Sequence, residues 1–179
     1  MEKGKRTSLC IVYTGDGKGK TTAAFGLCMR AAGHGKKSLV IQFMKGSGNK
    51  YGEAVLAAER IPEIKVVKSG RDCFVSRDKP HPDDIRLAAE GLALAEESVA
   101  SGQYHIVVLD EINVAIDYGL VPIERVLRLI NNRNPATHVV LTGRYARPEI
   151  IEAADTVTEM RLVKHHYYNG VPALESVEF

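Results

Sequence analysis

The chain has 179 residues, of which 45% are hydrophobic and 26% are charged, and its formal net charge is +2. This length suits a single domain over residues 1–179, the composition excludes a disordered or fibrous protein, and the small net charge gives no basic surface for nucleic acid. The three cysteines are far apart, and we see neither a signal peptide nor a membrane-length apolar run. We therefore expect a cytoplasmic protein with no membrane partner, disulfide or zinc site.

Apolar runs alternate with helix-compatible segments along the chain. The patterns predict strands at residues 9–13, 38–44, 64–67, 105–111, 138–142 and 156–162. They predict helices at residues 21–32, 51–60, 83–100, 122–132 and 148–154, the third of them capped by Asp83 or Asp84. Residues 69–82 contain two prolines and indicate a long loop. Because strands and helices alternate, we expect an α/β fold with a mostly parallel, doubly wound sheet and helices on both faces.

A glycine-rich stretch connects the first predicted strand to the first predicted helix. It matches the pattern G-x-x-x-x-G-K-[ST] at Gly19, Lys20 and Thr21, although Thr14 stands where the pattern has its first glycine. Glycine at positions 15, 17 and 19 allows positive φ and lets backbone N–H groups converge on phosphate oxygens at the positive end of the following helix. The alternative is a glycine-rich turn with solvated lysines. The strand–loop–helix context favours a phosphate-binding loop in which Lys20 contacts phosphate and the Thr21 hydroxyl joins a Mg²⁺ shell.

Two carboxylates, Asp110 and Glu111, end the fourth predicted strand directly after four apolar residues. This arrangement is typical of a Walker B strand, whose carboxylates hold Mg²⁺ directly or through water. The alternative is an acidic pair that only caps the next segment. Taken with Lys20 and Thr21, the two carboxylates predict a metal–nucleotide site.

Other polar residues after predicted strands are open to two interpretations. Arg144 follows the strand at 138–142 and can reach phosphate with its guanidinium group, but a solvated arginine fits the sequence nearly as well. Residues 165–168, His-His-Tyr-Tyr, suggest a metal site or a stacking platform, yet a partly exposed segment near the sheet edge explains them equally well. We assign no metal to them. The residues alone therefore indicate a Mg²⁺-dependent nucleotide-binding protein.

Six segments together resemble one enzyme family, the ATP:cob(I)alamin (corrinoid) adenosyltransferases of the bacterial cobalamin pathway. They lie in the family's order at residues 13–26, 40–46, 109–111, 141–144, 154–159 and 163–165. Phosphate-binding loops are common, but the combination with Gln-Phe-Met-Lys-Gly at 42–46 and Thr-Gly-Arg at 142–144 is far more specific. The resemblance implies a P-loop NTPase-like (RecA-like) fold.

The resemblance also implies the reaction. Reduced corrinoid, with cobalt as Co(I), would attack the 5′ carbon of ATP and displace triphosphate, with Mg²⁺ or Mn²⁺ as cofactor and the nucleotide reversed relative to ordinary NTPases. Electrostatic stabilisation of the leaving triphosphate would then be the main task of the loop. A Co-reducing flavoprotein and a second copy of the chain are the partners that the resemblance implies.

The resemblance assigns roles to individual residues. Lys20, Thr21 and Glu111 would be catalytic, and Thr21 and Glu111 would bind the metal together with Asp110. We expect the substrate and cofactor contacts at Thr14, Gly15, Asp16, Gly17, Lys18, Gly19, Lys20, Thr21, Thr22, Phe74 and Arg144. Relatives often have Gly-Phe-Thr-Trp in the long loop, with an aromatic pair beside the corrin ring. This chain has Cys-Phe-Val-Ser at residues 73–76 and no tryptophan, so only Phe74 can keep an aromatic role.

Two other functions fit the nucleotide motifs. A P-loop ATPase or phosphotransferase would use Glu111 to orient water or an acceptor and would produce ADP. A regulatory module would bind nucleotide or corrinoid without turnover. The products separate these functions, because only the transferase forms triphosphate and a cobalt–carbon bond.

Overall fold

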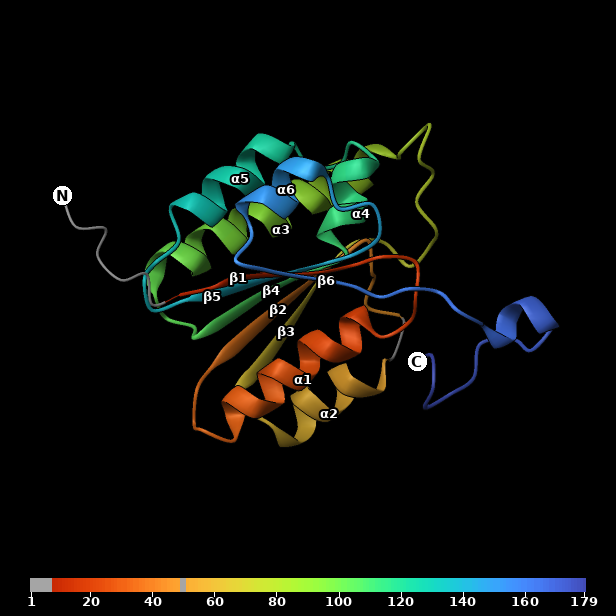
Figure 1. Cartoon of the computed structure of the whole chain (residues 1–179), viewed down its shortest axis with the longest axis horizontal. Coiled ribbons are helices and arrows are strands. Elements are labelled where there is room, and N and C mark those ends of the chain that lie inside the picture. The colour runs from red at the N-terminus through yellow and green to blue at the C-terminus, as the bar shows by residue number, and fades with distance from the viewer. Residues whose placement is uncertain (1–7, 49–50) are drawn as a thin grey trace.

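The structure, a computed structural model, describes residues 8–48 and 51–179 and contains one six-stranded sheet (Figure 1). The strand order is β3-β2-β4-β5-β1-β6, and every neighbouring pair is parallel. The strands are β1 Cys10–Thr14, β2 Ser38–Phe43, β3 Ile64–Ser69, β4 Ile106–Asp110, β5 His138–Thr142 and β6 Thr156–Glu159. The predicted parallel, doubly wound α/β fold is therefore confirmed.

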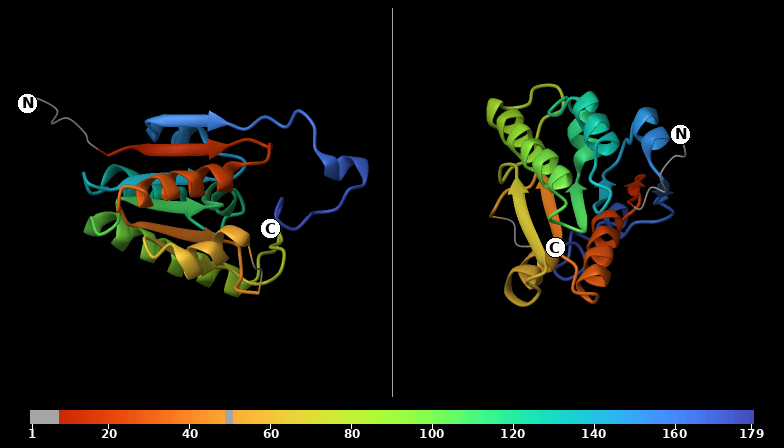
Figure 2. Two further views of the ribbon diagram at one scale, coloured as in Figure 1. Left: turned by 90° about the horizontal axis from the view of Figure 1, so that it is seen from below. Right: turned by 90° about the vertical axis from the view of Figure 1, so that its left-hand side faces the viewer.

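Helices cover both faces of the sheet. Figures 1 and 2 show α1 and α2 on one face and α3, α4, α5 and α6 on the other. The helices are α1 Lys20–Ala32, α2 Gly52–Arg60, α3 Pro82–Ser101, α4 Ile112–Asp117, α5 Ile123–Asn131 and α6 Pro148–Ala153, with a 3₁₀ helix, η1, at His166–Asn169. None of the helices in the described ranges is long and apolar enough to cross a membrane.

The two-sided cover explains why the central strands are continuously apolar. Every residue of β2 and β4 is buried, and Ile41, Leu109 and Leu141 have no accessible surface. Burial of a side chain of this size stabilises the fold by about 1.5–3 kcal/mol. The rigid sheet that results supports the polar residues at its carboxyl end.

Some element boundaries differ from the prediction. The predicted cap of α3 was wrong, since the helix begins at Pro82 and His81 is its cap: His81 Nδ1 accepts a hydrogen bond from the Asp83 N–H, while Asp84 accepts from the His81 N–H. The last strand ends at Glu159 rather than at 162. The sequence prediction missed α4, because its six residues are too few to show a helical period and it lacks the proline that marks the start of α6.

Candidate nucleotide-binding site

The glycine-rich stretch forms a loop between β1 and α1. Gly15 has a φ of 90° and Gly19 a φ of 114°, which L-residues with side chains rarely adopt. The prediction was wrong for Gly17, which is not among the residues of positive φ. This glycine is needed for another reason: a Cβ atom on Gly17 would lie 2.6 Å from the carbonyl oxygen of Met160.

Met160, directly after β6, supports this loop from outside. Its N–H donates to the carbonyl oxygen of Thr14 at 2.8 Å, and its carbonyl oxygen accepts from the N–H of Gly17 at 2.6 Å. A Cβ atom on Gly15 would also lie 2.6 Å from the same oxygen. The glycines therefore allow the last strand to approach the loop and fix its shape.

Lys20 lies inside the curve of the loop. Its Nζ donates to the carbonyl oxygens of Gly15 at 2.6 Å and Gly17 at 2.7 Å, and the residue is 8% exposed. Burial lowers the pKa of Lys20, although the nearby Glu111 carboxylate acts in the opposite direction. The structure thus excludes a freely solvated lysine and favours one that meets an anion in the loop.

Asp110 is the centre of a buried hydrogen-bond network at the ends of three neighbouring strands. Its Oδ1 accepts from the hydroxyls of Thr21 and Thr142, each at 2.8 Å. Its Oδ2 accepts from Nε2 of Gln42 at 2.9 Å and from Nζ of Lys45 at 2.8 Å. Four donors therefore hold a carboxylate that has no solvent-accessible surface.

The charges of this network support one another. Burial raises the pKa of Asp110, but the charge of Lys45 and the hydrogen bonds from Lys45, Thr142 and Gln42 outweigh it, so that the pKa lies below its ordinary value. Burial lowers the pKa of Lys45, and the Asp110 carboxylate more than reverses this effect. Asp110 and Lys45 consequently form an ion pair at neutral pH.

Glu111 turns the chain toward the cavity beside the loop. It has a φ of 64° and ψ of 17°, the left-handed conformation, and it is the residue before α4. The hydroxyl of Thr142 accepts a hydrogen bond from its N–H at 2.9 Å. Burial and the nearby Asp110 charge raise the pKa of Glu111. A strained conformation of this kind costs about 1–3 kcal/mol and is concentrated at functional sites.

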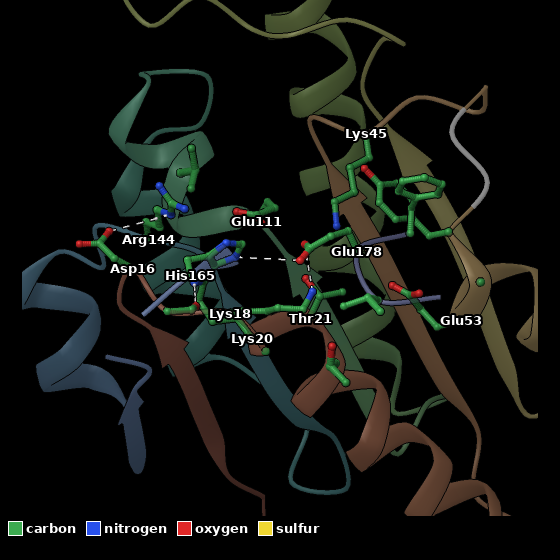
Figure 3. A pocket seen from close by; sticks show the side chains of 18 of the residues that line it. Asp16, Lys18, Lys20, Thr21, Lys45, Glu53, Glu111, Arg144, His165 and Glu178 are labelled. Atoms are coloured by element: carbon green, nitrogen blue, oxygen red, sulfur yellow. Dashed lines mark hydrogen bonds and ion pairs between the residues drawn. The ribbon is translucent and has the colours of Figure 1, made fainter. Parts of the chain in front are cut away.

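The phosphate-binding loop opens into a cavity of about 830 Å³ (Figure 3). Most of the residues that we predicted at the site line it: Asp16, Gly17, Lys18, Gly19, Lys20, Thr21, Thr22, Glu111 and Arg144. Arg144 lies 3.9 Å from the carboxylate of Asp16 across the mouth, and both side chains are exposed. The cavity thus combines cationic groups with the half-buried carboxylate of Glu111.

Three predicted residues lie behind this cavity, namely the fully buried Asp110 and two residues of the loop. Thr14 is buried, and its hydroxyl accepts a hydrogen bond from the N–H of Ala146 at 3.3 Å. Gly15 is covered by Met160 and Glu159. Neither belongs to the cavity lining. Both residues support the shape of the loop through contacts with the rest of the fold, and their direct contact with a ligand stays a prediction.

Phe74 lies in a neighbouring cavity of about 490 Å³, and its side chain is fully exposed. Four residues line both cavities: Lys45, Tyr51, Glu178 and Phe179. The base of the loop that carries Phe74 is anchored, because Arg71 donates to both carboxylate oxygens of Asp84, at 2.7 and 2.8 Å. The two cavities are therefore adjacent, and only the first contains the phosphate-binding loop.

The sequence interpretation assigned no role to several residues of the site. Gln42, Lys45 and Thr142 bind Asp110, and Glu178 lines the first cavity. Gln42, Lys45 and Thr142 occur in the two short motifs that carried the family resemblance, so that signal was present. Glu178 had no signal in the sequence, because only the folded chain brings residues 176–179 to the loop.

One protein family and several curated relatives match nearly the whole chain. The family described as ATP:corrinoid adenosyltransferase BtuR/CobO/CobP matches residues 6–179. A corrinoid adenosyltransferase of Pseudomonas aeruginosa is 42% identical over 169 residues, which are 94% of this chain and 82% of the relative. A corrinoid adenosyltransferase of Escherichia coli K12 is 38% identical, and corrinoid adenosyltransferase CobA of Salmonella typhimurium is 36% identical. Each match covers 96% of this chain and 85% of the relative. The chain belongs to the ATP:corrinoid adenosyltransferase family.

Proposed function

We propose that this chain transfers the 5′-deoxyadenosyl group of ATP to Co(I) of a corrinoid and releases triphosphate. The observation that carries the proposal is the direct junction of two cavities, one lined by a phosphate-binding loop and the other by Phe74. An adenosyl transfer needs two large substrates whose reacting atoms meet. Lys45 and Tyr51, which line both cavities, mark the place where these atoms would meet.

The loop would bind the triphosphate, which is the leaving group. Lys20 already donates two hydrogen bonds inside the loop, and a phosphate oxygen can replace the Gly15 and Gly17 carbonyls as its acceptor. Lys18 and Arg144 add positive charge at the cavity wall. These groups stabilise the negative charge that collects on triphosphate as the bond to carbon breaks.

The residues present fit a Mg²⁺ or Mn²⁺ ion. Mg²⁺ prefers oxygen ligands, and Thr21 and Glu111 supply a hydroxyl and a carboxylate to the same cavity. The Thr21 hydroxyl donates a hydrogen bond to Asp110, which leaves the lone pairs of its oxygen free for a cation. We propose Thr21 and Glu111 as ligands. Asp110, which we predicted as a third ligand, is fully buried among four donors and does not line the cavity, so we propose instead that it orients Thr21. The bound ion would offset charge on the triphosphate.

The transfer needs no protein base, because no proton moves in the step. The Co(I) electron pair forms the cobalt–carbon bond at the 5′ carbon, and the electron pair of the broken carbon–oxygen bond leaves with triphosphate. The protein's part is to hold both substrates in line and to exclude water. We propose that Phe74 contacts the corrin ring, since it is an exposed aromatic side chain in the second cavity.

Three finer features are also proposals. A homodimer and a flavoprotein that reduces the cobalt rest on the family resemblance, and a location in the cytoplasm rests on the sequence patterns described above. Light scattering of the purified protein tests the dimer. Reconstitution of turnover with a reduced flavoprotein, in place of a chemical reductant, tests the electron donor.

Incubation with ATP, Mg²⁺ and chemically reduced cobalamin tests the main proposal. We expect the absorption spectrum of adenosylcobalamin and one equivalent of triphosphate. ADP and phosphate would indicate an ATPase or phosphotransferase, and ATP binding without product would indicate a regulatory module. Either result contradicts the transferase.

A further inference from the structure

Two histidines and a glutamate converge at the edge of the nucleotide cavity. His165 and His166 lie at the start of η1, and Glu178 lies in the segment at 176–179. Nε2 of His166 is 3.5 Å from Oε1 of Glu178, and Nε2 of His165 is 4.0 Å from the same oxygen. The two imidazole rings stack with centroids 4.5 Å apart. One ligand atom from each residue lies within 4.8 Å of the others.

Two of these atoms form no hydrogen bond. Nε2 of His166 and Oε1 of Glu178 are buried, and their only polar contacts among the described residues are the long ones of 3.5 and 4.0 Å within the cluster. Buried polar atoms are nearly always satisfied, and an ion between the histidines and Glu178 would satisfy both of these atoms. Oε2, the other oxygen of Glu178, is held by Nζ of Lys18 at 3.0 Å. Lys18 thus orients the carboxylate and leaves Oε1 directed toward the histidines.

We propose that His165, His166 and Glu178 bind one divalent transition-metal ion of the Zn²⁺ class. Two imidazoles and one carboxylate suit Zn²⁺, Co²⁺ or Ni²⁺, whereas Mg²⁺ prefers an all-oxygen site such as that of Thr21 and Glu111. With metal–ligand bonds of about 2.0–2.1 Å, ligands of a tetrahedral ion lie about 3.4 Å apart. The distance from His166 to Glu178 already matches, the distance from His165 to Glu178 must shorten by roughly half an ångström, and the two imidazole nitrogens, up to 4.8 Å apart, must approach by more than that.

Binding changes the proton position on His165. In the free protein its Nδ1 accepts a hydrogen bond from the N–H of Tyr167 at 3.2 Å, which places the ring proton of the neutral imidazole on Nε2. A metal at Nε2 moves this proton to Nδ1, so the contact with Tyr167 is lost. Tyr167 is exposed and its N–H can turn to water. The first turn of η1 therefore rearranges when the ion binds.

The site would connect three separate parts of the chain. Glu178 brings the segment at 176–179, which forms part of the nucleotide cavity wall, to η1. Its contact with Lys18 extends the connection to the phosphate-binding loop. A bound ion would hold this wall in place beside the triphosphate position. The inference rests on the described geometry and does not depend on the transferase reaction.

Direct metal binding tests this inference without nucleotide or corrinoid. Protein free of any histidine tag is titrated with Zn²⁺ by calorimetry and with Co²⁺ by visible absorption, in excess Mg²⁺. We expect one equivalent to bind and the Co²⁺ spectrum to show a low-coordinate nitrogen–oxygen site. The substitutions His166→Asn and Glu178→Gln should each weaken Zn²⁺ binding by about 10- to 100-fold.

Three control variants separate this cluster from other ligands. His34→Ala removes an exposed histidine elsewhere, Cys73→Ser removes the exposed thiol, and Glu111→Gln alters the expected Mg²⁺ site. All three should bind Zn²⁺ as the wild type does, and circular dichroism checks the fold of every variant. The inference is overturned if stoichiometric Zn²⁺ does not bind, if both cluster variants bind it unchanged, or if a control variant loses it. Adenosyl transfer is assayed separately without Zn²⁺, so failure here leaves that reaction unaffected.

Discussion

The two adjoining cavities are built in opposite ways. Around Asp110 each polar atom has a partner within the fold, and the carboxylate is completely buried. Around Phe74 the wall includes exposed side chains at the tip of a loop, Cys73 and Phe74, while the two ends of that loop are held by the ion pairs Arg71–Asp84 and Arg77–Asp117. We therefore expect the nucleotide side to be formed in advance, and the exposed tip of the loop on the second side to adjust when a substrate binds.

The largest effect should follow the loss of Lys20, on the preformed side. Lys20→Ala removes the cation that lies inside the phosphate-binding loop, and we expect kcat/KM for ATP to fall by about 100-fold or more. Lys18→Ala is the matched control, because its side chain is half-exposed and paired with Glu178. We expect a loss of roughly tenfold or less for this variant. Equal losses in the two variants, or undiminished adenosylation in Lys20→Ala, would remove Lys20 from its proposed role.

A second substitution tests whether the network around Asp110 is rigid. Asp110→Asn leaves the Lys45 ammonium buried without its counter-ion, and we expect the free energy of unfolding to fall by about 3 kcal/mol. The control is Asp16→Asn, which removes an exposed carboxylate 3.9 Å from Arg144. It should change the free energy of unfolding by less than about 0.5 kcal/mol. Urea unfolding measures both. If Asp110→Asn lowers the free energy of unfolding no more than Asp16→Asn does, the network contributes little to stability.

The pH dependence of the same variant gives an independent check. The folded-state pKa of Asp110 lies below its ordinary value, so its stabilisation is complete above the unfolded-state pKa and is lost as pH falls through the folded-state pKa. The difference in unfolding free energy between wild type and Asp110→Asn should therefore narrow below about pH 4. A difference that stays constant at acid pH would contradict this assignment.

Glu111→Gln tests the metal ligand separately from the fold. The substitution keeps the backbone hydrogen bond to Thr142 but removes the carboxylate charge, and we expect about a tenfold higher Mg²⁺ concentration for half-maximal rate. Glu53→Gln, which lines the same cavity, serves as the control and should leave the titration unchanged. An unchanged titration in Glu111→Gln would exclude Glu111 as a ligand.

Phe74→Ala acts on the open side. The KM for corrinoid should rise by about three- to tenfold, from the loss of an aromatic contact, while the KM for ATP stays the same. Thermal stability should not change, because the side chain is fully exposed. The control is Tyr168→Ala, which removes an exposed aromatic side chain outside both cavities. Equal changes in the two KM values would place Phe74 elsewhere than at the corrin.

Thiol labelling follows the closing of the second cavity without any change of sequence. Burial raises the pKa of the Cys28 thiol to about 11, and Cys10 is also buried, so both should be unreactive in the folded protein. Cys73 is exposed and lines the second cavity, and it should react first. Corrinoid should slow this reaction severalfold and ATP should not. Protection by ATP alone would show that the two cavities are not separate in function.

The sequence predicted the strands, five of the helices and the glycine-rich loop between β1 and α1, because each depends on a local pattern. The Asp110 network was only partly predictable. The strand end indicated the carboxylate, but its donors Gln42 and Thr142 come from β2 and β5 and Lys45 from the loop after β2, and they meet only through the strand order. We attributed the glycine at position 17 to a positive φ, whereas the structure shows that a side chain there would collide with Met160. Met160 is distant in sequence, so this contact could not be predicted. Long-range contacts of this kind leave no periodic signal in a single chain.

The dependence of the phosphate-binding loop on Met160 has a consequence for synthesis. The loop leaves the ribosome early, but the strand that closes its outer side follows more than a hundred residues later. A nascent chain that already contains every residue of the loop is consequently still unable to hold it in shape. Nucleotide retention by ribosome-bound chains should begin only once β6 has emerged, which makes ATP a marker of completed folding.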